Sequence, residues 1–174
     1  GDLTGWIGYT LSKTTRDIPA VNNGQIFPAS YDRRHNLTLV AAYDLNERIS
    51  LGANFIYGTG RGLTLPRGVY NLQGQVGYEY TGRNEFRMPD FHRLDASITW
   101  RNKPDKKFKW ESNFSVYNVY GQRNPFAIFA QPKTDEGGGI ISNFDENGNL
   151  IIEQEIVQIN LFGILPSFSF TVFF

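Results

Sequence analysis

The two histidines are the first residues to consider for chemistry, because an imidazole can bind a metal or act as a base near neutral pH. His35 and His92 each stand beside Asp and Arg residues, near the start of a predicted strand that follows a long link. A metal pair or a His-Asp hydrolase would use such groups, but no further residue has ligand spacing and no nucleophile motif accompanies them. We therefore predict no catalytic residue, no metal ligand and no enzyme activity, and we expect both histidines to form hydrogen bonds at strand ends.

Two other segments resemble binding loops without having the required residues. Gly58–Gly62 has the glycines of a phosphate loop but lacks the Lys-Ser/Thr element and a strand-helix unit around it, so we interpret it as a flexible strand exit. Residues 145–149 suggest a calcium loop, yet their glycine and the final Glu are misplaced. Asn147-Gly148 is better interpreted as a tight hairpin turn joining 140–144 to 150–155. No cofactor is predicted.

Composition narrows the class of protein. Hydrophobic residues make up 40% and charged residues 20% of the 174 residues, which indicates a folded chain, and 15% aromatic residues with 18 glycines favour strands. The 17 basic and 17 acidic residues balance, so no nucleic-acid partner is predicted. The absence of cysteine excludes disulfides and thiolate metal sites, and no apolar run is long enough for a transmembrane helix. Because the chain begins at Gly1 without a methionine or a signal peptide, we expect the N-terminus of the gene product to lie elsewhere.

Six segments alternate apolar and polar residues, as strands with one apolar face do. They cover 3–12, 36–45, 49–58, 93–101, 108–116 and 167–174. The apolar positions of these segments contain no Lys, Arg, Asp or Glu. Such a face could contact lipid around a membrane barrel or form the core of a soluble β-sandwich, and alternation alone leaves both open.

The lengths of the links between these segments favour a membrane barrel over a soluble β-sandwich. Short polar links at Asn46–Arg48 and Asn102–Lys107 alternate with long links around 15–33, 60–91 and 131–154. Outer-membrane barrels have short periplasmic turns and longer external loops, whereas compact soluble domains seldom have three long structureless links. We therefore predict an all-β fold, a transmembrane antiparallel β-barrel, with the N-terminal end of the chain on the periplasmic side.

Two sets of side chains fit this barrel. Aromatic residues near strand ends could form the girdles of the two membrane interfaces; they are Tyr43, Tyr57, Trp100, Phe108 and Trp110. Charged residues on the polar face are expected to form cross-strand ion pairs lining the lumen; they are Arg93, Asp95, Arg101, Lys109 and Glu111.

Four segments also resemble a known family. They are Tyr31–Asn36 (YDRRHN), Met88–Asp95 (MPDFHRLD), Tyr117–Tyr120 (YNVY) followed by Asn124-Pro125, and Pro166–Phe174 (PSFSFTVFF). In their order and spacing they resemble the last third of TonB-dependent outer-membrane receptors. Within that family, they most resemble the receptors of Bacteroidota, including the SusC-like group.

The resemblance implies that residues 1–174 form the six C-terminal strands of a larger barrel of about 22 strands, with the N-terminal plug and the remaining strands elsewhere. It implies energised nutrient import across the outer membrane. The partners would be outer-membrane lipid, the rest of the barrel and its plug, TonB through an N-terminal region absent here, and a surface lipoprotein. In that family the closing strand is a signal for the barrel assembly machinery, and the matching positions here are Phe168, Phe170, Val172 and Phe174.

The long link 60–91 is predicted to contact a ligand or partner, since aromatic and Arg side chains dominate contact hot spots. The residues are Tyr70, Tyr78, Tyr80, Arg83 and Arg87. Two alternatives remain open: a passive or structural outer-membrane barrel without TonB coupling, and a soluble β-sandwich binding module. The sequence does not predict the substrate.

Overall fold

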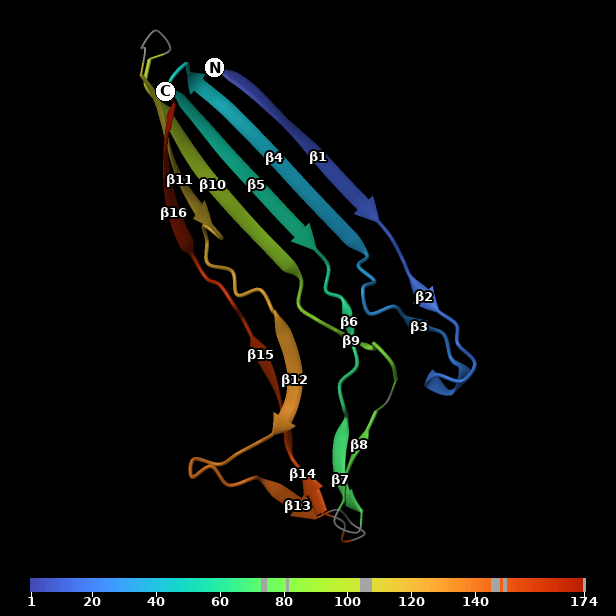
Figure 1. Ribbon diagram of the computed structural model, residues 1–174. Coiled ribbons are helices and arrows are strands. Elements are labelled where there is room, and N and C mark those ends of the chain that lie inside the picture. The colour runs from blue at the N-terminus through green and yellow to red at the C-terminus, as the bar shows by residue number, and fades with distance from the viewer. Residues whose placement is uncertain (73–74, 81, 104–107, 145–147, 149, 174) are drawn as a thin grey trace.

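The central element of the protein is a six-stranded antiparallel sheet (Figure 1). The computed structural model describes residues 1–72, 75–80, 82–103, 108–144, 148 and 150–173. The strand order is β1-β4-β5-β10-β11-β16, so each strand pairs with the next sheet strand along the chain. The strands are β1 (Asp2–Leu11), β4 (His35–Asn46), β5 (Ile49–Gly58), β10 (Phe91–Arg101), β11 (Lys109–Tyr117) and β16 (Leu165–Phe173). All six strands predicted from alternation are confirmed.

The hairpin predicted at Asn46–Arg48 is also confirmed. The Asn46 Oδ1 atom accepts hydrogen bonds from the backbone N–H groups of Arg48 at 2.9 Å and Ile49 at 3.0 Å. An Asn side chain that bonds the backbone two residues ahead stabilises a tight turn. The register shifts between Asp44 and Asn46, which is a local irregularity where the strand enters this turn.

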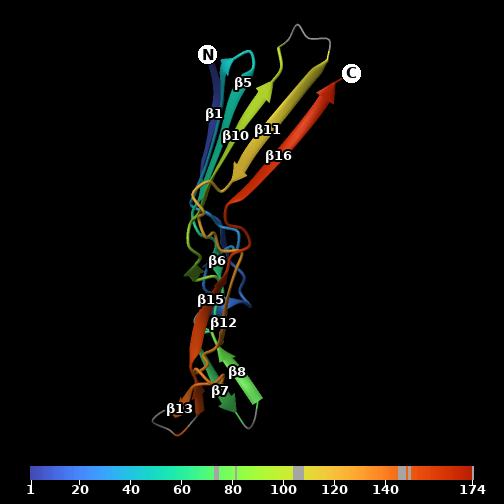
Figure 2. The same ribbon diagram turned by 90° about the vertical axis from the view of Figure 1, so that its left-hand side faces the viewer.

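The register places the apolar residues of the predicted alternation on one face, because directly opposed residues of neighbouring strands share a face. Other apolar residues lie on the opposite face, among them Trp6, Val40, Ile56 and Phe173. One row runs without interruption across the sheet: Leu3, Tyr43, Leu51, Ile98, Phe114 and Phe168. Figure 2 shows that the sheet is a single layer. The face is open to solvent, with Leu3 72% and Phe168 69% exposed. We call it the apolar face.

The sheet is not closed into a barrel. Within the described residues, β1 and β16 each pair with a strand on one side only. The prediction of an all-β chain with an antiparallel sheet is therefore confirmed, while a closed barrel would need strands beyond these six.

In the middle of the sheet, the opposite face carries small and mostly polar side chains. One row consists of Thr4, Ala42, Gly52, Ser97, Ser115 and Ser167. Among the predicted ion pairs, Arg101 and Glu111 lie opposite each other across β10 and β11 and approach to 2.6 Å. Arg93 pairs at 2.9 Å with Asp95 of its own strand, and Lys109 has no ion pair with a described residue. The predicted cross-strand ion pairing is thus confirmed for Arg101 and Glu111. Lys109 has no acidic residue opposite it on β16, because it faces Phe173.

The long links extend from one end of the sheet and contain short strands of their own (Figure 1). Within each long link the short strands pair with each other as hairpins, so the links are not structureless. A hairpin was predicted only in the third link. The pairs are β2 (Thr15–Arg16) with β3 (Phe27–Pro28), β6 (Gly62–Leu63) with β9 (Phe86–Arg87), β7 (Gly68–Leu72) with β8 (Gln75–Glu79), β12 (Ala127–Pro132) with β15 (Gln154–Ile159), and β13 (Ser142–Phe144) with β14 (Leu150–Ile152). A short 3-10 helix, η1 (Asn22–Gly24), lies between β2 and β3.

Two hairpins from different links join into one small sheet. Ile151 of β14 lies opposite Tyr70 of β7, which gives the order β13-β14-β7-β8. The antiparallel pairing of β13 and β14 agrees with the predicted hairpin, although residues 145–147 and 149 of its turn lie outside the described residues. No helix in the part of the chain that the structure describes is long and apolar enough to cross a bilayer.

Candidate functional site

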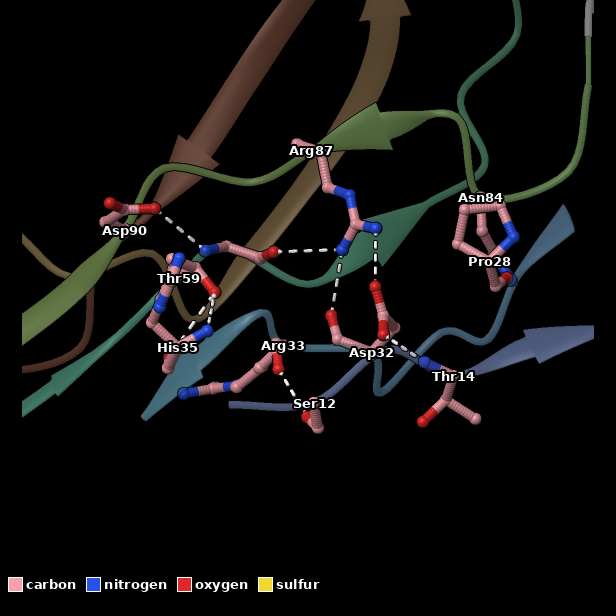
Figure 3. A network of polar contacts seen from close by, with 11 residues as sticks. Ser12, Thr14, Pro28, Asp32, Arg33, His35, Thr59, Asn84, Arg87 and Asp90 are labelled. Atoms are coloured by element: carbon pink, nitrogen blue, oxygen red, sulfur yellow. Dashed lines mark hydrogen bonds and ion pairs between the residues drawn. The ribbon is translucent and has the colours of Figure 1, made fainter. Parts of the chain in front are cut away.

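A polar network joins the link before β4 to the link before β10 at the loop end of the sheet (Figure 3). We call it the junction, and Asp32 and Arg87 lie at its centre. The Asp32 Oδ2 atom is 2.6 Å from Arg87 Nη2, and its Oδ1 atom accepts the Thr14 N–H at 2.5 Å. Arg87 Nη1 donates to the backbone oxygens of Asp32 at 2.9 Å and Gly60 at 3.3 Å. One arginine thus connects strand exits that are distant in sequence.

The charge of Asp32 is stabilised although its side chain is only 2% exposed. Burial alone would raise the pKa of Asp32, but the hydrogen bond from the Thr14 N–H and the Arg87 guanidinium outweigh burial and lower that pKa below its ordinary value of 3.8. A buried carboxylate that stays ionised needs both kinds of partner. The junction provides both.

Asp90 makes a second connection on the apolar side of the junction. Its Oδ2 atom accepts the Tyr57 hydroxyl at 2.6 Å, and its Oδ1 atom accepts the Gly60 N–H at 2.9 Å. The hydrogen bond from Tyr57, followed by that from Gly60, lowers the pKa of Asp90. Asp90 therefore holds the end of β5 to the start of β10.

Both histidines form hydrogen bonds at strand ends, as the sequence predicted. His35 Nδ1 lies 2.8 Å from the Tyr9 hydroxyl, and His92 Nδ1 lies 2.8 Å from the Tyr120 hydroxyl. The His92 backbone also exchanges two hydrogen bonds, of 3.1 and 2.9 Å, with the Asn124 side chain. Among the described residues no group of three His, Cys, Asp or Glu side chains could hold a metal ion.

Asn118 ties β11 to the return chain and is fully buried. Its Nδ2 atom donates to the backbone oxygens of Gln122 at 3.0 Å and Gly163 at 3.3 Å, and its Oδ1 atom accepts the Gln122 N–H at 3.0 Å. Its φ of 56° is a left-handed value, which Asn adopts more readily than most residues. With Asp32, Asp90 and His92, it shows that three of the four segments behind the family resemblance make structural connections at strand ends.

The structure separates the residues predicted to contact a ligand or partner. Arg87 belongs to the junction, and Tyr78 lies on β8, where it is exposed. Tyr70 lies on β7, and its side chain is outside what the structure describes. The Tyr78 and Tyr80 ring centroids lie 6.5 Å apart, and Tyr80 and Arg83 both belong to the wall of one hollow.

That hollow has a volume of about 480 Å³ and is the candidate binding site. Its wall consists of Val21, Asn22, Asn23, Thr64, Tyr80, Gly82 and Arg83. The Asn22 Oδ1 atom accepts the Arg83 N–H at 2.9 Å, and the Arg83 guanidinium lies 6.0 Å from the Phe27 ring centroid. Amides, a hydroxyl, a ring and a guanidinium can together contact a polar ligand. The sequence did not single out Asn22 and Asn23, because they come from another link.

The predicted assembly-signal residues lie on the edge strand β16. Phe168, Phe170 and Val172 share the apolar face, and β16 pairs with β11 along its inner side. The Phe170 and Trp110 rings are 5.8 Å apart. Phe174 lies outside the described residues. The described residues thus present an apolar, one-sided edge strand.

Comparison of the chain with protein-family models, with curated proteins and with solved structures finds no match. The family resemblance and the function that it implies therefore remain predictions.

Proposed function

We propose that this chain forms six neighbouring strands in the wall of an outer-membrane β-barrel, the C-terminal portion of a TonB-dependent receptor that imports a nutrient. The full barrel would have about 22 strands around a plug, as in receptors of this kind, with the SusC-like group of Bacteroidota as the nearest type. In this role the chain contributes wall and external loops, while TonB, the plug and a surface lipoprotein are partners of the whole protein.

The observation that carries the proposal is the apolar face. The strand register makes this face continuous across all six strands, and no Lys, Arg, Asp or Glu of these strands lies on it. A Lys or Arg on a lipid-facing strand costs about 2–4 kcal/mol near the bilayer midplane, so a lipid-facing wall must lack them. The described residues also place no second layer over this face, as a sandwich would require.

The strand lengths fit a bilayer. The six strands have between 9 and 12 residues. At about 3.3 Å per residue a ten-residue strand spans about 33 Å, and a tilt of about 45° reduces its height to about 23 Å. The apolar band of outer-membrane barrels is about 25 Å tall. The calculated height comes close to that of this band, and all six strands reach the about 9–11 residues typical of membrane-crossing strands.

Spin labels on alternate residues test the proposal in the full-length protein, reconstituted in lipid vesicles. The apolar-face variants are Leu39→Cys and Phe55→Cys, and the matched polar-face variants are Thr38→Cys and Asn54→Cys. Labels at 39 and 55 should be relaxed by oxygen, which concentrates in lipid, and labels at 38 and 54 by a water-soluble nickel chelate. This alternation is expected because side chains of a strand point to opposite faces.

Each contrary result has a defined meaning. Labels at 39 and 55 that neither reagent reaches would indicate a buried sandwich core and would refute the membrane proposal.

Cross-linking of the full-length protein to TonB in cells tests the second part of the proposal, that import is coupled to TonB. A lipid-facing pattern without any TonB cross-link would refute active import and favour the passive barrel.

A further inference from the structure

The short turn between β4 and β5 holds an arginine in a fixed position. Asn46 closes the turn through its side chain, and the Arg48 backbone oxygen accepts the Arg101 N–H at 2.8 Å. Arg48 Nε in turn donates to the Arg101 backbone oxygen at 3.3 Å. The guanidinium is therefore anchored by its Nε atom, while its two Nη atoms form no hydrogen bond or ion pair with a described residue.

The same guanidinium lies over an aromatic ring at the end of the apolar face. Arg48 Cζ is 5.8 Å from the Trp100 ring centroid. The centroids of the Trp100 and Trp110 rings are 6.0 Å apart in an edge-to-face arrangement, so a row of aromatic rings continues from β10 to β11. A cation over the face of Trp is attracted by the ring quadrupole, which favours this placement.

A hollow of about 330 Å³ adjoins this pair, with a wall of Asn46, Glu47, Arg48, Ile49 and Trp100. Within the described part of the chain, neither Glu47 nor Arg48 forms an ion pair. The hollow thus presents one anionic group, one cationic group and an aromatic wall, next to a face that carries no charge.

We propose that this hollow binds the headgroup of phosphatidylethanolamine, which carries one phosphate and one primary ammonium. Arg48 donates to the phosphate and Glu47 accepts from the ammonium, while the acyl chains follow the apolar face past Leu51 and Ile98. The inference rests on the proposed function, because the apolar face must contact lipid for a headgroup to reach the hollow.

The pairing of the two charges selects among headgroups. Phosphatidylglycerol offers the phosphate but no cation, so it would leave the Glu47 carboxylate beside a like charge. Phosphatidylcholine has a quaternary ammonium without N–H groups, which cannot donate a hydrogen bond to Glu47. Only a primary ammonium satisfies both side chains of the site.

Native mass spectrometry of the full-length protein, released from nanodiscs, measures this preference. The nanodiscs contain phosphatidylcholine as bulk lipid with equal amounts of phosphatidylethanolamine and phosphatidylglycerol. The unmodified protein should retain phosphatidylethanolamine several-fold above phosphatidylglycerol. Arg48→Gln should reduce retention of both lipids by about tenfold, since each loses a charge-assisted hydrogen bond.

Two further variants sharpen the test. Glu47→Gln should make retention of the two lipids nearly equal, because it weakens the ammonium contact and also removes the like charge beside phosphatidylglycerol. Lys103→Gln removes another exposed cation at the same end of the sheet, one that lies over no aromatic ring of the described residues, and should change nothing. Retention that Arg48→Gln leaves unchanged, or that Lys103→Gln reduces equally, would overturn the site.

The spin label at residue 39 separates this inference from the proposed function. Leu39 lies away from the turn, in the row with Ile7 and Phe55. If that label is in lipid while Arg48→Gln has no effect, the headgroup site alone is refuted. If that label is not in lipid, the proposed function fails first. Equal thermal unfolding of the variants and the unmodified protein establishes that losses do not come from misfolding.

Discussion

Asp32 is the residue whose replacement should loosen the junction most. Asp32→Asn keeps the size of the side chain but removes the charge that faces Arg87 at 2.6 Å. Because Asp32 is buried and Arg87 is 43% exposed, solvent weakens the pair, and we expect a loss of about 1–3 kcal/mol in the free energy of unfolding. Urea unfolding of the full-length protein measures it. Asp17→Asn, at an exposed site of the same link, is the control and should cost less than about 0.5 kcal/mol.

The pH dependence of this loss has a definite sign. The folded pKa of Asp32 lies below the unfolded value of 3.8, so the ionised carboxylate stabilises the fold at every pH above 3.8. Protonation at lower pH removes that contribution as the pH falls through the folded pKa. The difference between the unmodified protein and Asp32→Asn should therefore be constant near neutral pH and shrink below pH 3.8. A difference that grows in acid would contradict the charge-based account.

At the scale of the element, the two faces of β4 can be compared with a single kind of substitution. Ala41 lies on the apolar face opposite Gly5 and Ala53, and its neighbour Ala42 lies on the polar face opposite Thr4 and Gly52. If the apolar face contacts lipid as proposed, Ala41→Lys should reduce stability by about 2–4 kcal/mol relative to Ala42→Lys, because only the first would place an ammonium in lipid. Folded yield in the outer membrane and urea unfolding in vesicles measure the difference. Equal losses for the two variants would contradict the assignment of the faces.

The elements also show what the sequence could and could not predict. A period of two is a local property, so β4, β5 and the turn between them were predictable from their own residues. The contact of Asp32 with Arg87 joins residues on two different links, and alternation carries no information about such a pair. The joining of β14 to β7 is equally non-local. In the candidate site Tyr80 and Arg83 were named, whereas Asn22 and Asn23 reach the hollow only through the folding of another link.

At the scale of the whole molecule, the two ends of the sheet differ. Both chain termini lie at the end with the short turn after β4, and the paired long links extend from the other end (Figure 1). Six antiparallel strands with alternating short and long links must produce this asymmetry, since each strand reverses direction. In a membrane the end with the long links would face outward, because external loops of outer-membrane barrels are the longer ones.

Surface labelling of intact cells tests this orientation. Glu136 lies in the link after β12, and Lys103 follows β10 at the short-turn end; both are exposed, and this chain has no cysteine of its own. A maleimide on a polymer too large to pass porins should label Glu136→Cys in intact cells, but label Lys103→Cys only after the outer membrane is permeabilised. The barrel wall would stand between the reagent and residue 103. The reverse pattern would mean the opposite orientation, and labelling of both residues in intact cells would show that the sheet does not separate two compartments.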